Sequence, residues 1–523
     1  MSNIEKLKFS KDQFYILFLT LFSILINQYF GYVGILPIDS FLIFNSGYDF
    51  LNGYYPFKDF WTIKEPFIDI LQALFFKLFG VSWFSYVLHA SFFNFLISIS
   101  TYFSLKYFNL SSIESFFYSL CVAILTYPTA GTPFSDHHTL ILNILSVYIF
   151  FVAVKKNNNF LWFCLPILLG CSFLSKQTPT SYIALMIGFL SLIFFINKRF
   201  LKSLFVSFLG LATFLLLFFL FLKLGNIKFN DFYTQYILFP KSLGETRLDW
   251  VFPLEFKRIV LRFKVHYLAA SILFYLLFMN FFSKKVNLKF EDKIIITSLI
   301  LTLFFFIFHQ LMTINAIFIY CLIPIFSAFS HIYSKIYLKN NKINHFFLIL
   351  TFIATTYYFF NYVQNRTFMD LNTFDLNKSV DGELIHKSFK NIRWLTMFYP
   401  EDPQKEIESI RNAMDILKKD KSVNMIITDY QFISVFLNKY DYSTTRFWYN
   451  FHGYPDPTNK YFDYWKNFNL KILKENNIEN IFVFSPLHGD EKPIENIFDK
   501  CLIKEQLTSQ LYKFNLNNCP ELN

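Results

Sequence analysis

The sequence predicts a polytopic α-helical membrane protein that ends in a small α/β domain. Of its 523 residues, 54% are hydrophobic and 22% aromatic, whereas only 16% are charged. Soluble domains carry about 25% charged residues, so this balance favours the membrane class. From about residue 361 the charge rises, and helical and strand patterns alternate. We therefore expect a transmembrane domain over residues 1–363 and a small extracytoplasmic α/β domain over residues 364–523.

About eleven apolar runs are long enough to cross a bilayer of about 30 Å. They are residues 14–34, 84–105, 113–127, 140–154, 160–174, 182–196, 204–222, 267–282, 294–308, 314–331 and 346–360. No small-residue cleavage site follows the first run, so we expect a retained helix rather than a signal peptide. Two long outer loops are predicted, at residues 37–83 and 223–266.

Basic side chains collect in alternate short loops, for example at Lys155 and Lys156 and at Lys198 and Arg199. The positive-inside rule places these loops and the N-terminus in the cytoplasm. An odd number of helices then puts the C-terminal domain on the other side, so we expect a bacterial inner (plasma) membrane with this domain in the periplasm. Topology thus explains the formal charge of +11, and we expect no nucleic-acid partner.

The C-terminal residues show short helical and strand patterns. Residues 406–420 carry apolar side chains at helical spacing, and residues 423–429 form an apolar run of the buried-strand type. A further helix at residues 459–476 and a strand at 478–485 predict a partly parallel sheet. Cys501 and Cys519 lie in this polar part, where they either form a disulfide or remain two free thiols.

The first outer loop, residues 37–83, concentrates ionisable side chains between two apolar runs. Because burying them in hydrocarbon would be costly, the loop is expected at the membrane surface. Asp39 directly follows the first run, where a carboxylate is suited to cap the next helix. Lys64 and Glu65 precede Pro66, and a helix start with a lysine favours anions. The alternative for Lys64 is an anchor at the lipid headgroups.

Two more groups of polar residues are predicted on the same outer face. Asp136, His137 and His138 begin an apolar run, where they either ligate a divalent metal, orient a phosphate, or cap the helix. Lys176 and Gln177 lie in a tight turn, and Lys176 either holds a phosphate or extends to the interface as an anchor. Arg247 lies in the second outer loop, where about residues 254–267 predict an interfacial amphipathic helix.

The order of these features resembles the GT-C superfamily of polytopic membrane glycosyltransferases, which includes polyprenyl-phosphate-sugar mannosyltransferases and aminoarabinose transferase-like enzymes. The first loop has an acidic residue after the first helix, then Tyr-Pro, Asp-Phe-Trp, a basic residue and a proline. Asp136-His137-His138 and Lys176-Gln177-Thr178 follow in the family's order. Family members often carry a paired acidic motif in the first loop, whereas Ser40 follows Asp39 here.

The resemblance, which covers about the first 330 residues, implies a function. Asp39 would be the general base and Asp136 a second catalytic carboxylate. The residues implied in binding the donor phosphate or substrate are Lys64, Glu65, His137, His138, Lys176, Gln177 and Arg247. The donor would be a polyprenyl-phosphate sugar, and the acceptor a lipid, glycan or protein hydroxyl on the periplasmic face. No cofactor is required by this reading; a divalent metal, if used, would lie at Asp136 and His137.

Two alternatives belong to other functional classes. A transporter or lipid flippase would place charged or Gly/Pro-broken helices near the bilayer midplane in two matching halves. Here the ionisable residues gather at one surface, and no two halves match. A non-catalytic subunit of a cell-envelope glycan assembly system is the other alternative, and it would make Asp39 and Asp136 dispensable.

Overall fold

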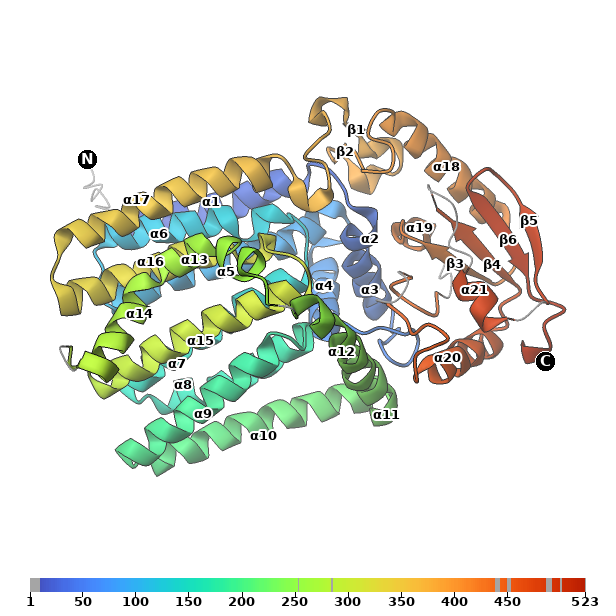
Figure 1. Ribbon diagram of the computed structural model, residues 1–523. Helices are drawn as coiled ribbons and strands as arrows, with labels where there is room; N and C mark the ends of the chain where they lie inside the picture. Colours follow the sequence, from blue (N-terminus) through green and yellow to red (C-terminus); the bar gives the residue numbers. More distant parts are fainter. Residues whose placement is uncertain are drawn as a thin grey trace, which may run out of the picture.

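The computed structural model describes residues 10–252, 254–283, 286–437, 443–448, 453–485, 492–498 and 501–522. The molecule is elongated, with a bundle of long helices at one end and a β-sheet at the other (Figure 1). Three helices of the first outer loop lie between the two ends: α2 (Pro37–Ser40), α3 (Leu42–Leu51) and α4 (Pro66–Phe79). The first outer loop therefore joins the helical and the C-terminal parts.

Among the described residues, eight helical segments are long and apolar enough to cross a membrane. They are α1 (Lys11–Gly31), α5 (Trp83–Tyr107), α7 (Ser135–Lys156), α9 (Thr180–Lys198), α10 (Leu201–Leu224), α15 (Phe290–Met312), the segment Ile317–Leu338 around α16 (Leu322–Tyr333), and the segment Asn341–Met369 that begins with α17 (Asn341–Tyr358). Large apolar side chains of α10, such as Phe208, Leu216 and Phe219, stay exposed. Such surfaces suit lipid rather than water, and they indicate a multi-pass membrane protein.

The predicted number of about eleven spanning helices is not confirmed. Three of the predicted runs fall on helices too short to count among the eight: α6 (Ser112–Leu125), α8 (Asn159–Ser175), and the pair α13 (Lys264–Ala269) and α14 (Ser271–Phe278). The chain turns after α6 because Pro128 follows within three residues of its end, and proline disfavours a helical conformation in the residue before it. Apolar length alone therefore does not establish the number of full spans.

The C-terminal residues contain a four-stranded sheet with the order β3-β4-β6-β5. β3 (Asn424–Thr428) and β4 (Asn480–Phe484) are parallel, whereas β6 (Leu511–Asn515) is antiparallel to both β4 and β5 (Ile503–Gln506). The helices of this part are α18 (Pro403–Lys419), α19 (Phe432–Phe436), α20 (Phe462–Glu475) and α21 (Lys492–Ile497), and a small ladder joins β1 (Val380–Asp381) to β2 (Arg393–Trp394). β3 and β4 are buried along their whole length, which explains their continuous apolar runs.

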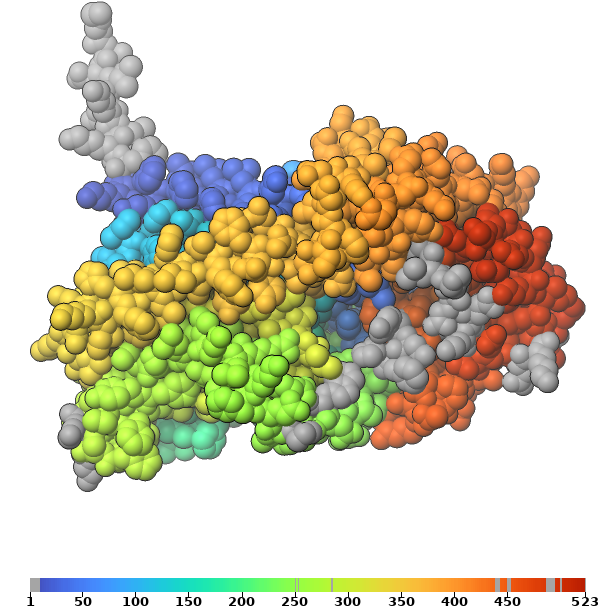
Figure 2. Space-filling view, turned by 45° about the horizontal axis from the view of Figure 1, so that its top comes forward, coloured from blue at the N-terminus to red at the C-terminus, as the bar shows by residue number. Residues whose placement is uncertain are grey.

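The C-terminal residues share one hydrophobic core with the first outer loop. Phe41 of the loop stacks against Phe389 and Trp394, with ring centroids 5.8 and 5.9 Å away. A backbone hydrogen bond also joins the C-terminal residues to the chain just before this loop: Ile35 N donates to Leu395 O at 2.9 Å. Figure 2 shows the orange and red C-terminal residues continuing from the helical part without a gap. The boundary at residue 363 stays a prediction.

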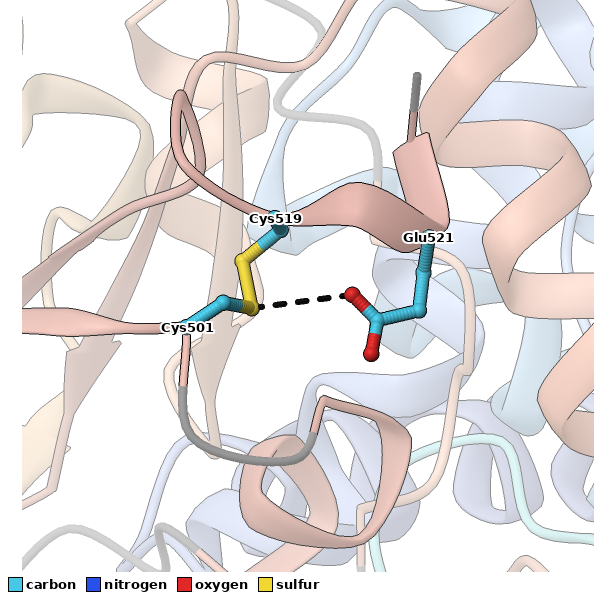
Figure 3. A group of neighbouring side chains, drawn as sticks. All are labelled: Cys501, Cys519 and Glu521. Atoms are coloured by element: carbon cyan, nitrogen blue, oxygen red, sulfur yellow. Dashed lines mark hydrogen bonds between the residues drawn. A yellow bond between two sulfur atoms is a disulfide. The ribbon is translucent and has the colours of Figure 1, made fainter.

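Cys501 and Cys519 form a disulfide, so the free-thiol alternative is wrong. The bond links the residues just before β5 to the chain that follows β6 (Figure 3). Glu521 Oε2 lies 3.7 Å from Cys501 Sγ. The disulfide therefore closes the outer hairpin of the sheet.

Candidate active site

Asp136 lies in the first turn of α7, where both oxygens of its carboxylate are engaged. Lys176 Nζ donates to Asp136 Oδ2 at 2.6 Å, and His309 Nε2 lies 2.9 Å from Asp136 Oδ1. The Lys176 and Asp136 side chains are only 15% and 8% exposed. Burial lowers the pKa of Lys176 below its usual value, while the charge of Asp136 opposes that effect. Asp136 thus joins α7, the turn after α8 and the end of α15 at one point.

Asp39 lies in α2 and is half-buried. Within the described parts of the chain, no hydrogen bond or ion pair engages its carboxylate. Burial raises the pKa of Asp39 above its usual value; the charges of Lys64 and Lys176 act against this increase, whereas the charge of Asp136 adds to it. These effects also place Asp39 within electrostatic reach of both lysines and Asp136. An unpaired carboxylate in such surroundings is suited to accept a proton.

Lys64 and Glu65 stand directly before α4. The Lys64 ammonium lies 4.6 Å from the centre of the Phe447 ring, and no acidic partner contacts it in the described residues. Glu65 is buried and has a left-handed backbone with φ of 75°, an uncommon conformation that ends at Pro66, the first residue of the helix. Burial raises the pKa of Glu65, and the charge of Lys64 opposes the change.

Arg247 belongs to α12 (Phe239–Val251), in the second outer loop after the short helix α11 (Phe229–Phe232). It is half-buried, and burial lowers its pKa below the usual value while the charge of Asp136 opposes that shift. The charge of Arg247 also acts on Lys176. The charges of Lys64 and Lys176 therefore act on Asp39, and those of Lys176 and Arg247 on Asp136. A group of cations beside a partly buried carboxylate can hold an anionic leaving group.

The side-chain amide of Gln177 is hydrogen-bonded to backbone carbonyls of two loops. Its Nε2 donates to Ile63 O at 2.9 Å and to Tyr236 O at 2.8 Å. It thus ties the first outer loop to the second. The predicted role of Gln177 in substrate binding remains a prediction.

The structure does not bring His138 to the cations. His138 Nε2 lies 2.9 Å from His89 Nε2, and His89 Nδ1 lies 2.9 Å from Gln72 Oε1, while Tyr127 OH contacts His138 Nδ1. Because Gln72 Oε1 can only accept, His89 Nδ1 donates to it, which leaves His89 Nε2 as an acceptor. His138 Nε2 donates to His89 Nε2, and His138 Nδ1 in turn accepts from the Tyr127 hydroxyl. One set of neutral tautomers satisfies the whole chain, which links α7 to α4 through α5.

His137 points elsewhere, into an aromatic pocket. Its ring stacks on Tyr127 at 4.9 Å and meets the edge of Phe318 at 5.1 Å. Both carboxylate oxygens of Asp136 contact Lys176 and His309, and a metal at Asp136 and His137 stays a prediction. Within the described residues, the group with metal-site spacing is Cys501, Cys519 and Glu521, whose sulfurs are joined in the disulfide and are not thiolate ligands.

Two residues beside the site were not predicted from the sequence. Arg446 and Phe447 come from the C-terminal part and lie next to Lys64 and Glu65. They sit near no motif, and only the folded chain brings them to the first outer loop. No signal in the sequence could have identified them.

Residues 64–222 match the family model of dolichyl-phosphate-mannose-protein mannosyltransferases. This match supports a GT-C-like membrane glycosyltransferase and confirms the resemblance seen in the motifs. The matched residues include Lys64, Asp136 and Lys176, whereas Asp39 and Arg247 lie outside them. Among curated proteins, none matches the chain.

Proposed function

We propose that this protein transfers a sugar from a polyprenyl-phosphate donor to a hydroxyl of a lipid, glycan or protein on the periplasmic face of a bacterial inner membrane. The observation that carries the proposal is Asp39: an unpaired carboxylate, among the described residues, within electrostatic reach of Lys64 and Lys176. The family match over residues 64–222 supports the reaction class and the type of donor.

In the proposed reaction, the Asp39 carboxylate takes the proton of the acceptor hydroxyl. The acceptor oxygen forms a bond to the anomeric carbon of the sugar, and the bond between that carbon and the phosphate oxygen breaks. The phosphate leaves with its polyprenyl chain and carries the electron pair. Lys64, Lys176 and Arg247 stabilise the negative charge that develops on it. Asp136 acts as a positioning residue, because its carboxylate holds Lys176 and His309.

We also propose that transfer needs no added metal, and that Lys64, Lys176 and Arg247 supply the positive charge that stabilises the leaving phosphate. The expected result is an unchanged transfer rate after treatment with EDTA, measured with the purified protein. A loss of transfer that Mg²⁺ or Mn²⁺ restores would contradict this proposal.

The disulfide between Cys501 and Cys519 supports the placement of the C-terminal part outside the cytoplasm. Disulfides persist in oxidising compartments and are rare in the cytosol. The same placement brings Asp39 to the outer face, because the C-terminal residues pack on the first outer loop.

The test of the function uses the purified protein in lipid nanodiscs with a panel of radiolabelled polyprenyl-phosphate sugars. Asp39→Asn should reduce transfer by about 10²- to 10⁴-fold, because the general base is lost. Asp415→Asn, an exposed carboxylate on α18, is the matched control and should transfer normally. Undiminished transfer by a folded Asp39→Asn protein rejects the role of Asp39. No transfer from any donor by the wild type favours the transporter or subunit alternatives.

A further inference from the structure

A pocket lies between the first outer loop and residues 443–448, which we name the tail segment. Its lining comes from α3, from the loop before α4, from α4 and from the tail segment. The polar and aromatic residues of the lining are Ser46, Thr62, Lys64, Glu65, Asp69, Arg446 and Phe447. The pocket therefore adjoins the candidate active site, because Lys64 and Glu65 belong to both.

The tail segment is held firmly at this place. Trp61 N donates to Thr444 O at 2.7 Å, and Arg446 N donates to Trp61 O at 3.0 Å. The Arg446 guanidinium forms an ion pair with Asp49, and both side chains are only 3% exposed. It also lies 3.9 Å from the centre of the Phe60 ring. The tail segment is thus bound to the first outer loop by backbone hydrogen bonds and a buried ion pair.

One polar atom of this arrangement lacks a partner. Arg446 Nε is buried and makes no hydrogen bond. A buried donor without an acceptor is costly, and such a group in a native protein calls for a missing ligand or water. Arg446 is also one of the residues that line the pocket.

The charges of the lining select the chemistry of that ligand. An anion would meet the carboxyl groups of Glu65 and Asp69, and a cation would meet Lys64 and Arg446. A neutral hydroxyl satisfies both kinds of group, because it accepts from a guanidinium and donates to a carboxylate. The free space is about 10 Å³, which suits one water molecule or one hydroxyl group. The Phe447 ring adds an apolar face of the kind that ligand pockets combine with a few polar groups.

We propose that this pocket receives one hydroxyl group of the donor's sugar, and that Arg446 and Phe447 are specificity-determining residues contributed by the C-terminal part. Arg446 Nε donates to the sugar hydroxyl, which donates in turn to the carboxylate of Glu65 or Asp69. The Phe447 ring packs against the carbon atoms beside that hydroxyl. The inference rests on the proposed function and extends it, since it makes the C-terminal part a component of the substrate site.

The test compares two lipids in the full-length protein in nanodiscs: undecaprenyl phosphate without a sugar, and undecaprenyl phosphate linked to mannose, glucose, galactose or arabinose. The ratio of their dissociation constants isolates the contribution of the sugar. Arg446→Lys keeps the charge that faces Asp49 but lacks Nε, and Phe447→Leu keeps the ion pair intact. Arg411→Lys, exposed on α18, is the matched control.

In the wild type, at least one sugar should tighten binding relative to the bare lipid. Arg446→Lys should reduce this gain about tenfold, the value of one hydrogen bond to a charged group, while binding of undecaprenyl phosphate stays the same. Phe447→Leu should change which sugar binds best. If Arg446→Lys does not fold, the sugar preference of Phe447→Leu alone tests the pocket assignment.

The outcomes separate the pocket from the function. A gain that is unchanged in both variants, or a wild type in which no sugar tightens binding, overturns the pocket assignment even if the protein transfers sugar. A sugar-dependent gain that falls in the variants, with no transfer by the wild type, supports the pocket and rejects the proposed transferase reaction.

Discussion

At the scale of single residues, two carboxylates of the candidate site have different surroundings. Asp136 gives both oxygens to Lys176 and His309. Asp39 has no such partner among the described residues and has a raised pKa. Environment therefore distinguishes a carboxylate that positions its neighbours from one that can take up a proton.

The pH dependence of transfer tests the role of Lys64. Its positive charge lowers the pKa of Asp39 against the effect of burial. Lys64→Met should raise that pKa further, so the acid limb of the kcat/KM profile should move to higher pH, because Asp39 is active only when deprotonated. Lys471→Met, an exposed lysine paired with Glu475, should leave the limb in place. A limb that stays in place or moves to lower pH in Lys64→Met would contradict the assignment.

Removal of Asp136 should affect stability as well as transfer. In Asp136→Asn, Lys176 would remain buried without a carboxylate, which costs about 3 kcal/mol of unfolding free energy. Adding Lys176→Met should recover part of that loss but no transfer, since the cation is gone. Thermal unfolding of the purified variants, read beside the transfer assay, checks both statements. If the double variant is less stable than Asp136→Asn alone, the buried charge is not the cause.

At the scale of elements, one buried arginine joins segments that carry the site. Arg366 follows α17, and its Nε donates to Val33 O at 2.8 Å, just after α1. Its other nitrogens donate to Pro128 O, Thr129 O and Ala130 O at 2.8, 3.3 and 3.0 Å. These carbonyls belong to the turn between α6 and α7. The guanidinium thus sets the distance between the segment of Asp39 and the helix of Asp136.

Arg366→Lys tests this link. An ammonium group lacks the planar fork that reaches several carbonyls at once. We expect a loss of about 3 kcal/mol of unfolding free energy, because carbonyl oxygens are left buried without donors. Thermal unfolding in detergent measures the loss, and the exposed variant Arg411→Lys serves as the control. A variant as stable as the wild type would show that water or another side chain replaces the guanidinium.

At the scale of the whole molecule, the C-terminal part is bound to the first outer loop through a common core. Phe41, Phe389 and Trp394 are fully buried together, and Arg446 is paired with Asp49 across the same interface. The loop that carries Asp39 therefore depends on residues that follow the transmembrane helices.

Truncation after residue 363 examines this dependence. Residues 1–363 alone should aggregate or lose their compact loop, because the truncation leaves the apolar side chains of α2 and α3 without partners. Size-exclusion chromatography of the membrane-extracted fragment would detect aggregation, and limited proteolysis would detect loss of the compact loop. A monodisperse fragment whose first outer loop resists protease would support the predicted boundary as a true division between independent domains.

The sequence by itself determined the class of the protein and the positions of its motifs. Apolar runs depend on local composition, so they identify membrane helices directly, and the buried strands β3 and β4 fall within the predicted runs for the same reason. Motif order located Asp39, Lys64, Asp136 and Lys176 along the chain. The number of full spans stays a prediction, because apolar length does not show where a helix ends.

Only the tertiary structure decided which side chains meet. Adjacent residues on a helix point about 100° apart, so Asp136, His137 and His138 reach three different surroundings although they are neighbours in sequence. Asp136 pairs with His309 over a separation of 173 residues, and Asp49 with Arg446 over 397. Such pairs form because packing of distant elements removes water around both groups. That packing is a property of the whole fold, which no local pattern contains.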